Sequence, residues 1–429
     1  MIKTWRLDDL RQTLVLGSRE ERLAQILYWG PPLPASENLQ TLVQADARDL
    51  TGGMLDENPA LSICPEARRG FPGQAGLVAE DAQGKALLPL FIFESAEETV
   101  NALVLTYRDD ALQLTYQAQF DLDPETHVIS VKASLSSVDP VKLTWFAAPV
   151  FPAPQGSQEM TDFAGRWCGE FQMNTTAWSA GIRERENHTG RTGHENFPGL
   201  LVPMKGARNT QGHVYGFHYG WSGGHRMVAE ELPDGRRQIQ FGHARGIERT
   251  PQTRFETAVL YAAFSDEGSN GCAVAFQRHL RDRVLDLPDP SRPRPVHYNC
   301  WEAVYFDHKP EELKDIATLA ASLGAERFVL DDGWFGQRDD DTQSLSDWQV
   351  DLRKYPEGLS PLIDHVHDQG MSFGIWFEPE MINQNSDTYR LHPEWVLGPK
   401  DQILGRQQMV LNMALPDVQS YLFDAIARI

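Results

Sequence analysis

Residues 310–333 read PEELKDIATLAASLGAERFVLDDG, a helix-like segment that runs into a short apolar strand and two aspartates. Downstream, SPLIDHVHDQG (360–370) and SFGIWFEPE (372–380) repeat the order of helix and strand. Upstream, VHYNCW (296–301) is a further apolar run, and PDVQSYLFDAIARI (416–429) is a last helix-like segment. Because strands that alternate with helices form parallel sheets, this part of the chain predicts an α/β unit.

The expected helix boundaries follow from capping signals. Pro310 suits the first turn of one helix, and Ser360 is predicted as the N-cap of the next, with Gly370 just past its end. The first helix is predicted to bury one apolar face, made of Leu313, Ile316, Leu319, Ala320 and Leu323. These signals place both helices between successive strands.

Residues 1–285 have a different pattern. Runs such as THVISVKASLSS (126–137) and VKLTWFAAPVF (141–151) alternate apolar and polar residues between turn signals. Many short strands with hairpin-like spacing predict a large antiparallel β-sandwich. Next, DLPDPSRPRP (286–295) holds four prolines in ten residues, which predicts a linker. The expected fold class is therefore multidomain, with a β-sandwich over 1–285, a linker over 286–295 and an α/β unit over 296–429.

Acidic and aromatic residues gather where the predicted parallel strands end. Trp301 and Glu302 follow the first strand; the later strand ends carry Asp331, Asp332, Trp334, Trp376, Glu378 and Glu380. Ligands of parallel βα arrays bind at these ends. Carboxylates accept hydrogen bonds from hydroxyls, and aromatic faces pack on the C–H face of a pyranose, so the pattern favours a sugar site.

Each of these features also has a plainer structural interpretation. Adjacent aspartates can simply start a turn, and Glu378-Pro379-Glu380 can be a strand exit. The run Asp339–Asp341 is interpreted as a solvated loop. Placement at three consecutive strand ends nevertheless favours a site over three separate turns.

Composition excludes several classes of function. The chain has 39 Lys and Arg against 60 Asp and Glu, a net charge of −21, so nucleic acid and anionic membranes are not expected partners. The four cysteines lie far apart and the first residues are charged, so a cytoplasmic protein is expected. The sequence lacks HExxH, GxGxxG, P-loop and GxSxG motifs, so we expect neither a metal nor a nucleotide cofactor.

Five motifs together resemble glycoside hydrolase family 36, the α-galactosidases of the bacterial raffinose and melibiose type. They are YNCWEAVYF (298–306), LDDGWF (330–335), SDWQVDLRKYP (346–356), GIWFEPEM (374–381) and GRQQMVLN (405–412). RWCGEF (166–171), GRTGHENFPGLLV (190–202) and YGWSGGHRM (219–227) resemble the large β-sandwich domain of that family. The resemblance implies an N-terminal sandwich followed by a (β/α)8 barrel. It also implies hydrolysis of terminal α-galactose, as in melibiose or raffinose-type oligosaccharides, by a retaining two-carboxylate mechanism.

The resemblance assigns Asp331 and Asp332 to hydroxyls at the O4/O6 end of galactose. Trp301 would line the sugar pocket, Trp348 would pack at the galactose ring, and Arg406 would donate hydrogen bonds near the nucleophile and the sugar. The supporting residues would be Trp334, Trp376, Glu378 and Glu380. The family is also implied to form homo-oligomers, commonly tetramers in which sandwich loops reach a neighbour's active site; residues 46–76 are the candidate stretch.

The catalytic carboxylates implied by the resemblance have no counterpart in this sequence. The nucleophile belongs to a K-W-D-x-N motif on the fourth barrel strand, which does not occur here, and the acid/base follows the sixth strand. We therefore expect residues 296–429 to form three of eight βα units, to end at Ile429 before the nucleophile motif, and to be inactive alone. The alternatives are a non-catalytic galactoside-binding or scaffold relative, an α-N-acetylgalactosaminidase and a galactosyl transferase.

Overall fold

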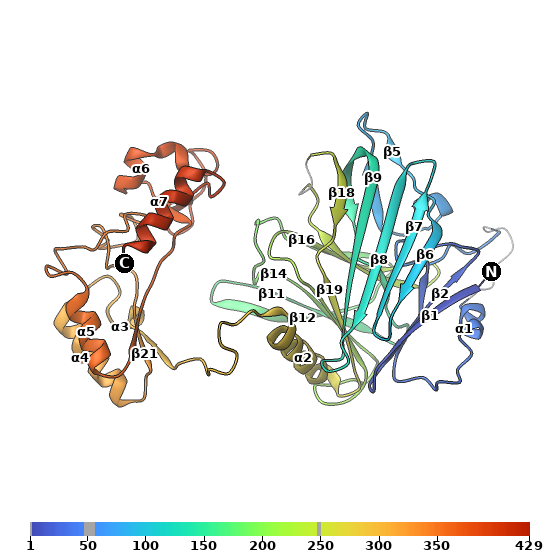
Figure 1. Cartoon of the computed structure of the whole chain (residues 1–429), viewed down its shortest axis with the longest axis horizontal. Coiled ribbons are helices and arrows are strands. Elements are labelled where there is room, and N and C mark those ends of the chain that lie inside the picture. Colours follow the sequence, from blue (N-terminus) through green and yellow to red (C-terminus); the bar gives the residue numbers. More distant parts are fainter. Residues whose placement is uncertain (1, 47–55, 247–249) are drawn as a thin grey trace. The chain divides into compact units, whose positions relative to one another are not determined.

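The computed structural model describes residues 2–46, 56–246 and 250–429 (Figure 1). The chain divides into two compact units, Met1–Asp286 and Leu287–Ile429. Each unit has a hydrophobic core of its own. The two are therefore described separately.

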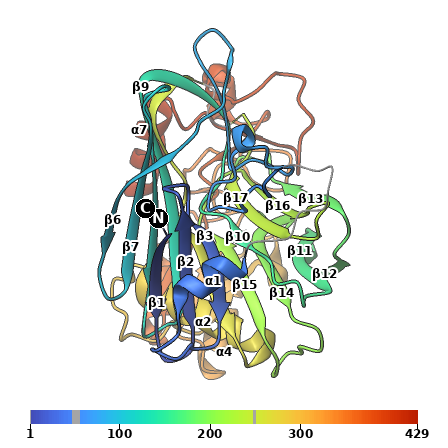
Figure 2. The same ribbon diagram turned by 90° about the vertical axis from the view of Figure 1, so that its right-hand side faces the viewer.

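Antiparallel sheets dominate the first unit (Figures 1 and 2). The largest has 12 strands: β4 (Leu77–Glu80), β5 (Ala86–Leu87), β6 (Ile92–Glu98), β7 (Ala102–Asp109), β8 (Leu114–Leu122), β9 (Val128–Phe146), β11 (Glu159–Arg166), β12 (Gly169–Ala177), β14 (Asn196–Pro203), β15 (Val214–Tyr219), β18 (Gln252–Glu256) and β19 (Leu260–Ser265). A four-stranded sheet contains β10 (Phe151–Pro152), β13 (Gly181–Glu186), β16 (His225–Glu231) and β17 (Arg237–His243). A three-stranded sheet contains β1 (Ile2–Asp8), β2 (Thr13–Arg19) and β3 (Gln25–Gly30). The prediction of a β-rich N-terminal domain is confirmed.

Alternating side chains build the core between these sheets. In β8, buried residues recur at every second position, so one face of the strand lies in the core and the other faces outward. Buried residues from all three sheets join in one cluster. Strand β9 differs from expectation, because the runs 126–137 and 141–151 were predicted as separate strands. The exposed Asp139-Pro140 lies inside β9, where a proline interrupts no buried pairing.

In the described part of this unit, the helical elements are α1 (Leu39–Ala45), the 3-10 turn η1 (Ala67–Arg69), α2 (Gly268–His279) and the π-helical turn η2 (Leu280–Val284). Helix α2 packs on β15 and β19, and its buried Cys272 lies 3.3 Å from the carbonyl oxygen of Val214. Residues 285–296, all of them described, lie in turns and irregular backbone between η2 and β20, and the boundary between the two units falls within them, after Asp286.

The second unit contains a parallel sheet in the order β20 (His297–Asn299), β21 (Arg327–Leu330) and β22 (Ser372–Ile375). Its helical elements are α3 (Trp301–Val304), α4 (Pro310–Ser322), α5 (Ser360–Asp368), α6 (Asp387–Leu391), the 3-10 turn η3 (Pro393–Trp395) and α7 (Pro416–Ala427). A two-stranded antiparallel pair, β23 (Met381–Asn383) and β24 (Gln408–Val410), follows β22. Helix α4 connects β20 to β21, and α5 connects β21 to β22.

The buried face of α4 differs from the predicted one. Leu313, Ala317 and Ala320 are buried, whereas Leu319 is 61% exposed and Leu323 is 80% exposed. At 3.6 residues per turn, Leu319 points about 120° away from Leu313, so the predicted stripe combined two faces. The expectation for Leu319 and Leu323 was therefore wrong.

The start of α5 is also shifted by one residue. Its N-cap is Leu359, which makes no side-chain capping bond, and Ser360 is the first helical residue. Leu359 is buried, so packing of this leucine rather than a serine cap fixes the entry to the helix. Within the described residues, none of the helices has the length and apolar character needed to cross a bilayer.

Candidate functional site

The carboxyl ends of β20, β21 and β22 lie side by side in the second unit. In the parallel register, Asn299 is opposite Val329, and Val329 is opposite Gly374. The amide of Trp376 donates to the carbonyl of Leu330 over 2.9 Å, which continues the ladder just past β22. The residues predicted at three strand ends are thus brought together at one edge of the sheet.

Asp331 is held by the neighbouring strand. Its Oδ2 accepts a hydrogen bond of 2.5 Å from Asn299 Nδ2, and its Oδ1 accepts one of 2.7 Å from the amide of Asp332. The Cys300 Sγ lies 3.4 Å from the Asp331 amide. Only 8% of Asp331 is exposed. These bonds fix the carboxylate at the start of the loop after β21.

Asp332 forms an ion pair with a residue that the sequence did not single out. Arg338 donates through Nε to Asp332 Oδ1 over 2.9 Å and through Nη2 to Oδ2 over 2.8 Å. The two side chains are 0% and 2% exposed. Burial raises the pKa of Asp332, and the Arg338 guanidinium partly offsets that rise. The pair is a planar, two-bond fork that sets the orientation of the Asp332 carboxylate.

Lys354 is a second residue whose role was missed. Its ammonium donates to the carbonyl oxygens of Phe306, Gly333 and Arg338 over 3.0, 3.0 and 2.8 Å. These carbonyls belong to the loops after β20 and β21, so one partly buried cation connects both loops. Lys354 lies in the quoted motif SDWQVDLRKYP, but sequence order alone does not reveal which carbonyls it meets.

The loop that carries Arg406 is anchored by Asn383. The side-chain Oδ1 of Asn383 accepts a hydrogen bond of 2.8 Å from Arg338 Nη1, and its Nδ2 donates one of 2.8 Å to the carbonyl of Gln407. Arg406 itself is exposed, has φ of +51° and lies 3.3 Å from Asp341. The predicted Arg406 is near Asp332, because its charge, like that of Arg338, opposes the rise that burial causes in the pKa of Asp332.

The loop Asp339–Asp341 was interpreted as solvated. Asp339 and Asp341 are indeed about half exposed, at 45% and 47%, but both are paired with cations. Asp339 lies 3.0 Å from Arg353 and 3.1 Å from Lys354, and Asp341 lies 3.7 Å from Arg338. The acidic run Asp339–Asp341 therefore belongs to a salt-bridged loop. Arg338, the arginine directly before it, is the residue that the sequence analysis overlooked.

The two glutamates after β22 differ. Glu378 is half-buried and accepts a hydrogen bond of 3.0 Å from Gln408 Nε2. Burial raises the pKa of Glu378, the charge of Arg406 opposes that rise, and the charges of Glu380 and Asp332 add to it. Glu380 is exposed. Both glutamates therefore lie within electrostatic reach of the site, but among the described residues only Glu378 is oriented by a side-chain bond.

The predicted tryptophans divide into buried and accessible ones. Trp334 and Trp348 are 0% and 2% exposed and belong to an aromatic cluster with Phe335 and Phe377. Trp376 is half-buried, and its carbonyl accepts a 3.0 Å bond from Trp334 Nε1. Trp301 is also half-buried and contacts Tyr305 and Phe306 edge-on. Trp334 and Trp348 contact Trp376 from the core, so Trp348, which the resemblance places at the galactose ring, is a buried neighbour of Trp376.

The site offers acceptors rather than a set of metal ligands. Both oxygens of Asp332 are already engaged by the Arg338 cation. Throughout the described ranges, no group of three or more His, Cys, Asp or Glu side chains is placed to hold a metal ion.

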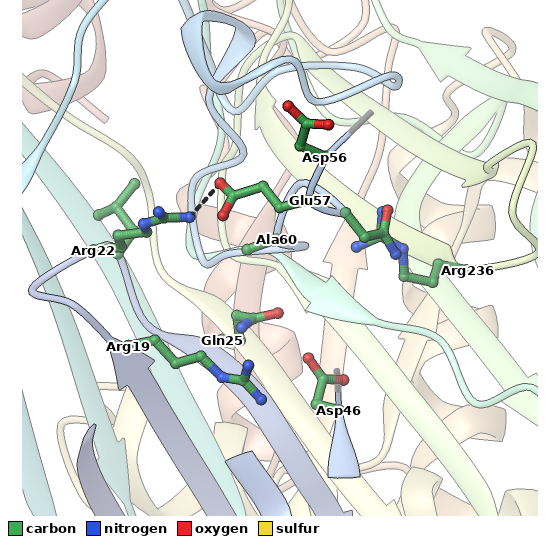
Figure 3. Close-up of a pocket in the computed structure, with 10 residues that line it drawn as sticks. Arg19, Arg22, Gln25, Asp46, Asp56, Glu57, Ala60 and Arg236 are labelled. Atoms are coloured by element: carbon green, nitrogen blue, oxygen red, sulfur yellow. Dashed lines mark hydrogen bonds and ion pairs between the residues drawn. The ribbon is translucent and has the colours of Figure 1, made fainter. Parts of the chain in front are cut away.

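The candidate stretch 46–76 lies in the first unit, and its residues 47–55 are outside the described residues. The described part borders a polar pocket (Figure 3), lined in part by Asp46, Asp56 and Glu57. Arg22 Nη1 donates a hydrogen bond of 2.6 Å to Glu57 Oε1, drawn as a dashed line in Figure 3. That residues 46–76 reach the active site of a neighbouring subunit stays a prediction.

Comparison with known proteins agrees with the motifs. The model of the glycosyl hydrolase family 36 N-terminal domain matches residues 22–247, and the melibiase model matches residues 254–429. The chain is 37% identical to an alpha-galactosidase of Escherichia coli, over 98% of this chain and 59% of that protein. It is 33% identical to alpha-galactosidase AgaA of Geobacillus stearothermophilus, over 78% of this chain and 47% of AgaA. The chain thus spans about half the length of the curated relatives it matches.

Solved structures show the same similarity. The alpha-galactosidase of Lactobacillus brevis superposes with a TM-score of 0.87 at 27% identity, over 99% of this chain and 61% of that one. A form of AgaA in complex with raffinose has a TM-score of 0.87 at 25% identity, over 99% of this chain and 64% of that one. Because the family 36 domain alone matches more than half of the residues, this chain belongs to glycosyl hydrolase family 36.

Proposed function

We propose that this protein acts in the hydrolysis of terminal, non-reducing α-D-galactose residues, with Asp331 and Asp332 as the residues that bind the sugar hydroxyls. The observation that carries the proposal is the pair of adjacent, oriented carboxylates at the end of β21, with the half-buried Trp301 and Trp376 following the neighbouring strands β20 and β22. The relatives named alpha-galactosidase, and the AgaA complexes with raffinose and stachyose, support this substrate class.

The architecture we propose has three parts. Residues 1–285 form the sandwich, residues 286–295 the linker, and residues 296–429 the first three βα units of a (β/α)8 barrel. Support comes from the parallel order of β20, β21 and β22 with helices between them. A complete barrel of this type has about 250 residues. The active form is further proposed to be a homo-oligomer.

The chemical roles follow from the side chains. Carboxylates accept hydrogen bonds from galactose hydroxyls, and Trp376 supplies an aromatic face for the C–H surface of the ring. Trp348 and Trp334 hold that ring in place from behind, and Arg406 places positive charge next to Asp332. We propose that both catalytic carboxylates of the retaining mechanism belong to later barrel units, so residues 1–429 alone bind galactose without hydrolysing galactosides.

The test measures binding and turnover separately on the 429-residue protein. Galactose binding is followed by tryptophan fluorescence or calorimetry for the wild type and for Asp332→Asn, with Asp364→Asn on the exposed side of α5 as the matched control. We expect binding that Asp332→Asn weakens at least tenfold, about 1.4 kcal/mol, and that Asp364→Asn leaves unchanged. Equal affinity in all three proteins would contradict the sugar-binding role. Release of nitrophenol from nitrophenyl α-galactoside would contradict the inactivity of these residues alone.

A further inference from the structure

We propose that Arg338 is the positioning residue of the sugar site, holding Asp332 as a fixed, ionised carboxylate that accepts bonds from two hydroxyls of one galactose. Arg338 does not itself touch the sugar in this proposal. The inference rests on the proposed function, because it assigns the residue that makes the Asp332 site competent.

The first argument is the geometry of the pair. Each Asp332 oxygen takes one N–H from the same guanidinium, over 2.9 and 2.8 Å. An ionised carboxylate has about four lone-pair positions, so the fork uses two and leaves one on each oxygen. Two neighbouring hydroxyls are the matching donors, because each can give one hydrogen to one of these oxygens.

The second argument is electrostatic. Asp332 is 2% exposed and follows another aspartate, and both its burial and the charge of Asp331 favour the protonated form. In a protonated carboxyl, one oxygen carries the proton and becomes a hydrogen-bond donor, so one acceptor position is lost. The cations that oppose protonation are Arg338 and the 45% exposed Arg406, of which only Arg338 is bonded to the carboxylate. Glu378 adds negative charge nearby.

The third argument is that Arg338 is itself held in place. Its Nη1 donates to the carbonyl of Gln343 and to Asn383 Oδ1, each over 2.8 Å, and its guanidinium lies 5.3 Å from the Phe306 ring centre. Asn383 in turn bonds the carbonyl of Gln407, next to Arg406. Four donated bonds in one plane suit arginine and cannot be reproduced by a lysine, whose ammonium is a point charge.

The test compares Arg338→Met, Arg338→Lys, Asp332→Asn and the double variant Arg338→Met/Asp332→Asn in the 429-residue protein. The control is Arg353→Met, since Arg353 is half exposed and pairs with Asp339 and Asp351 outside the fork. The midpoint of thermal unfolding is measured by fluorescence, and the affinity for galactose is measured at several pH values between pH 5 and pH 8.

We expect Arg338→Met to lower the thermal midpoint and to weaken galactose binding at least tenfold. The double variant should regain most of the midpoint, because it removes the unpaired buried charge, but none of the affinity. Arg338→Lys should fold, bind weakly, and lose binding at a higher pH than the wild type as pH falls. Arg353→Met should keep wild-type affinity and the wild-type pH profile.

Two results would overturn the inference. The first is wild-type affinity and pH profile in Arg338→Lys or Arg338→Met. The second is a double variant no more stable than Arg338→Met, which would show that Arg338 does not serve Asp332. If the wild type fails to bind galactose, the proposed function fails instead. The order of thermal midpoints then still decides whether Arg338 and Asp332 act as a pair.

Discussion

Replacement of His225 by phenylalanine should make the first unit less sensitive to acid. His225 lies in β16, is 0% exposed, and neither ring nitrogen has a hydrogen-bond partner among the described residues. Burial lowers the pKa of His225 from its ordinary 6.5 to about 4, with smaller contributions from the charges of His218 and Arg185. An apolar ring of similar size can therefore replace the imidazole without losing a bond.

The sign and size of the effect of His225 on the free energy of unfolding follow from proton linkage. Below pH 6.5 the unfolded chain binds a proton at this histidine that the folded chain does not bind, so the free energy of unfolding falls as pH falls. The loss grows until about pH 4 and reaches roughly 3 kcal/mol, because the pKa falls from 6.5 to about 4 and each pH unit between them contributes about 1.36 kcal/mol. At pH 5 the same relation gives about 2 kcal/mol.

The assay is urea unfolding, followed by tryptophan fluorescence at pH 7.5 and pH 5.0. We expect the difference in unfolding free energy between the two pH values to be about 2 kcal/mol smaller in His225→Phe than in the wild type. His188→Phe is the matched control, because the His188 side chain is 61% exposed, and it should behave as the wild type. Identical pH dependence in His225→Phe and the wild type would refute the reasoning.

Two further changes test the second unit and the thiols. Lys354→Met should lower the free energy of unfolding by about 3 kcal/mol, since three carbonyls each lose a bond worth about 1 kcal/mol. Lys314→Met, which removes an exposed pair with Glu311, should cost under 1 kcal/mol. Thermal and urea unfolding compare the two variants, and equal losses would contradict the role of Lys354 in connecting the two loops. Native protein should react with a thiol reagent at Cys168 alone, because Cys168 is exposed and the other three cysteines are buried, with the pKa of Cys300 raised to about 11 by burial. Absorbance after reagent addition counts the thiols, and fast reaction of more than one in the folded protein would contradict the described burial.

Local sequence determined the type and order of the helices and strands, because both depend on the periodicity of apolar residues and on the positions of proline and glycine. The alternation in residues 126–137, the order of helix and strand around β21, and the prolines of 286–295 were all evident from the sequence. Details that depend on packing were not. The Asp139-Pro140 pair did not end β9, and Leu319 faces outward from α4, because partners distant in sequence decide which positions are buried.

For the candidate site, too, some features were evident from the sequence and others only from the tertiary structure. The sequence by itself determined the family and the residues at three strand ends, because the C-terminal ends of parallel strands must share one edge. Only the tertiary structure showed that Arg338 and Lys354 hold these residues in place, and that Trp348 is buried while Trp376 is accessible. The Asp332–Arg338 ion pair depends on distances accurate to tenths of an ångström within the loop after β21, and the burial of a side chain depends on the whole packed unit. Neither is encoded in the spacing of residues along the chain.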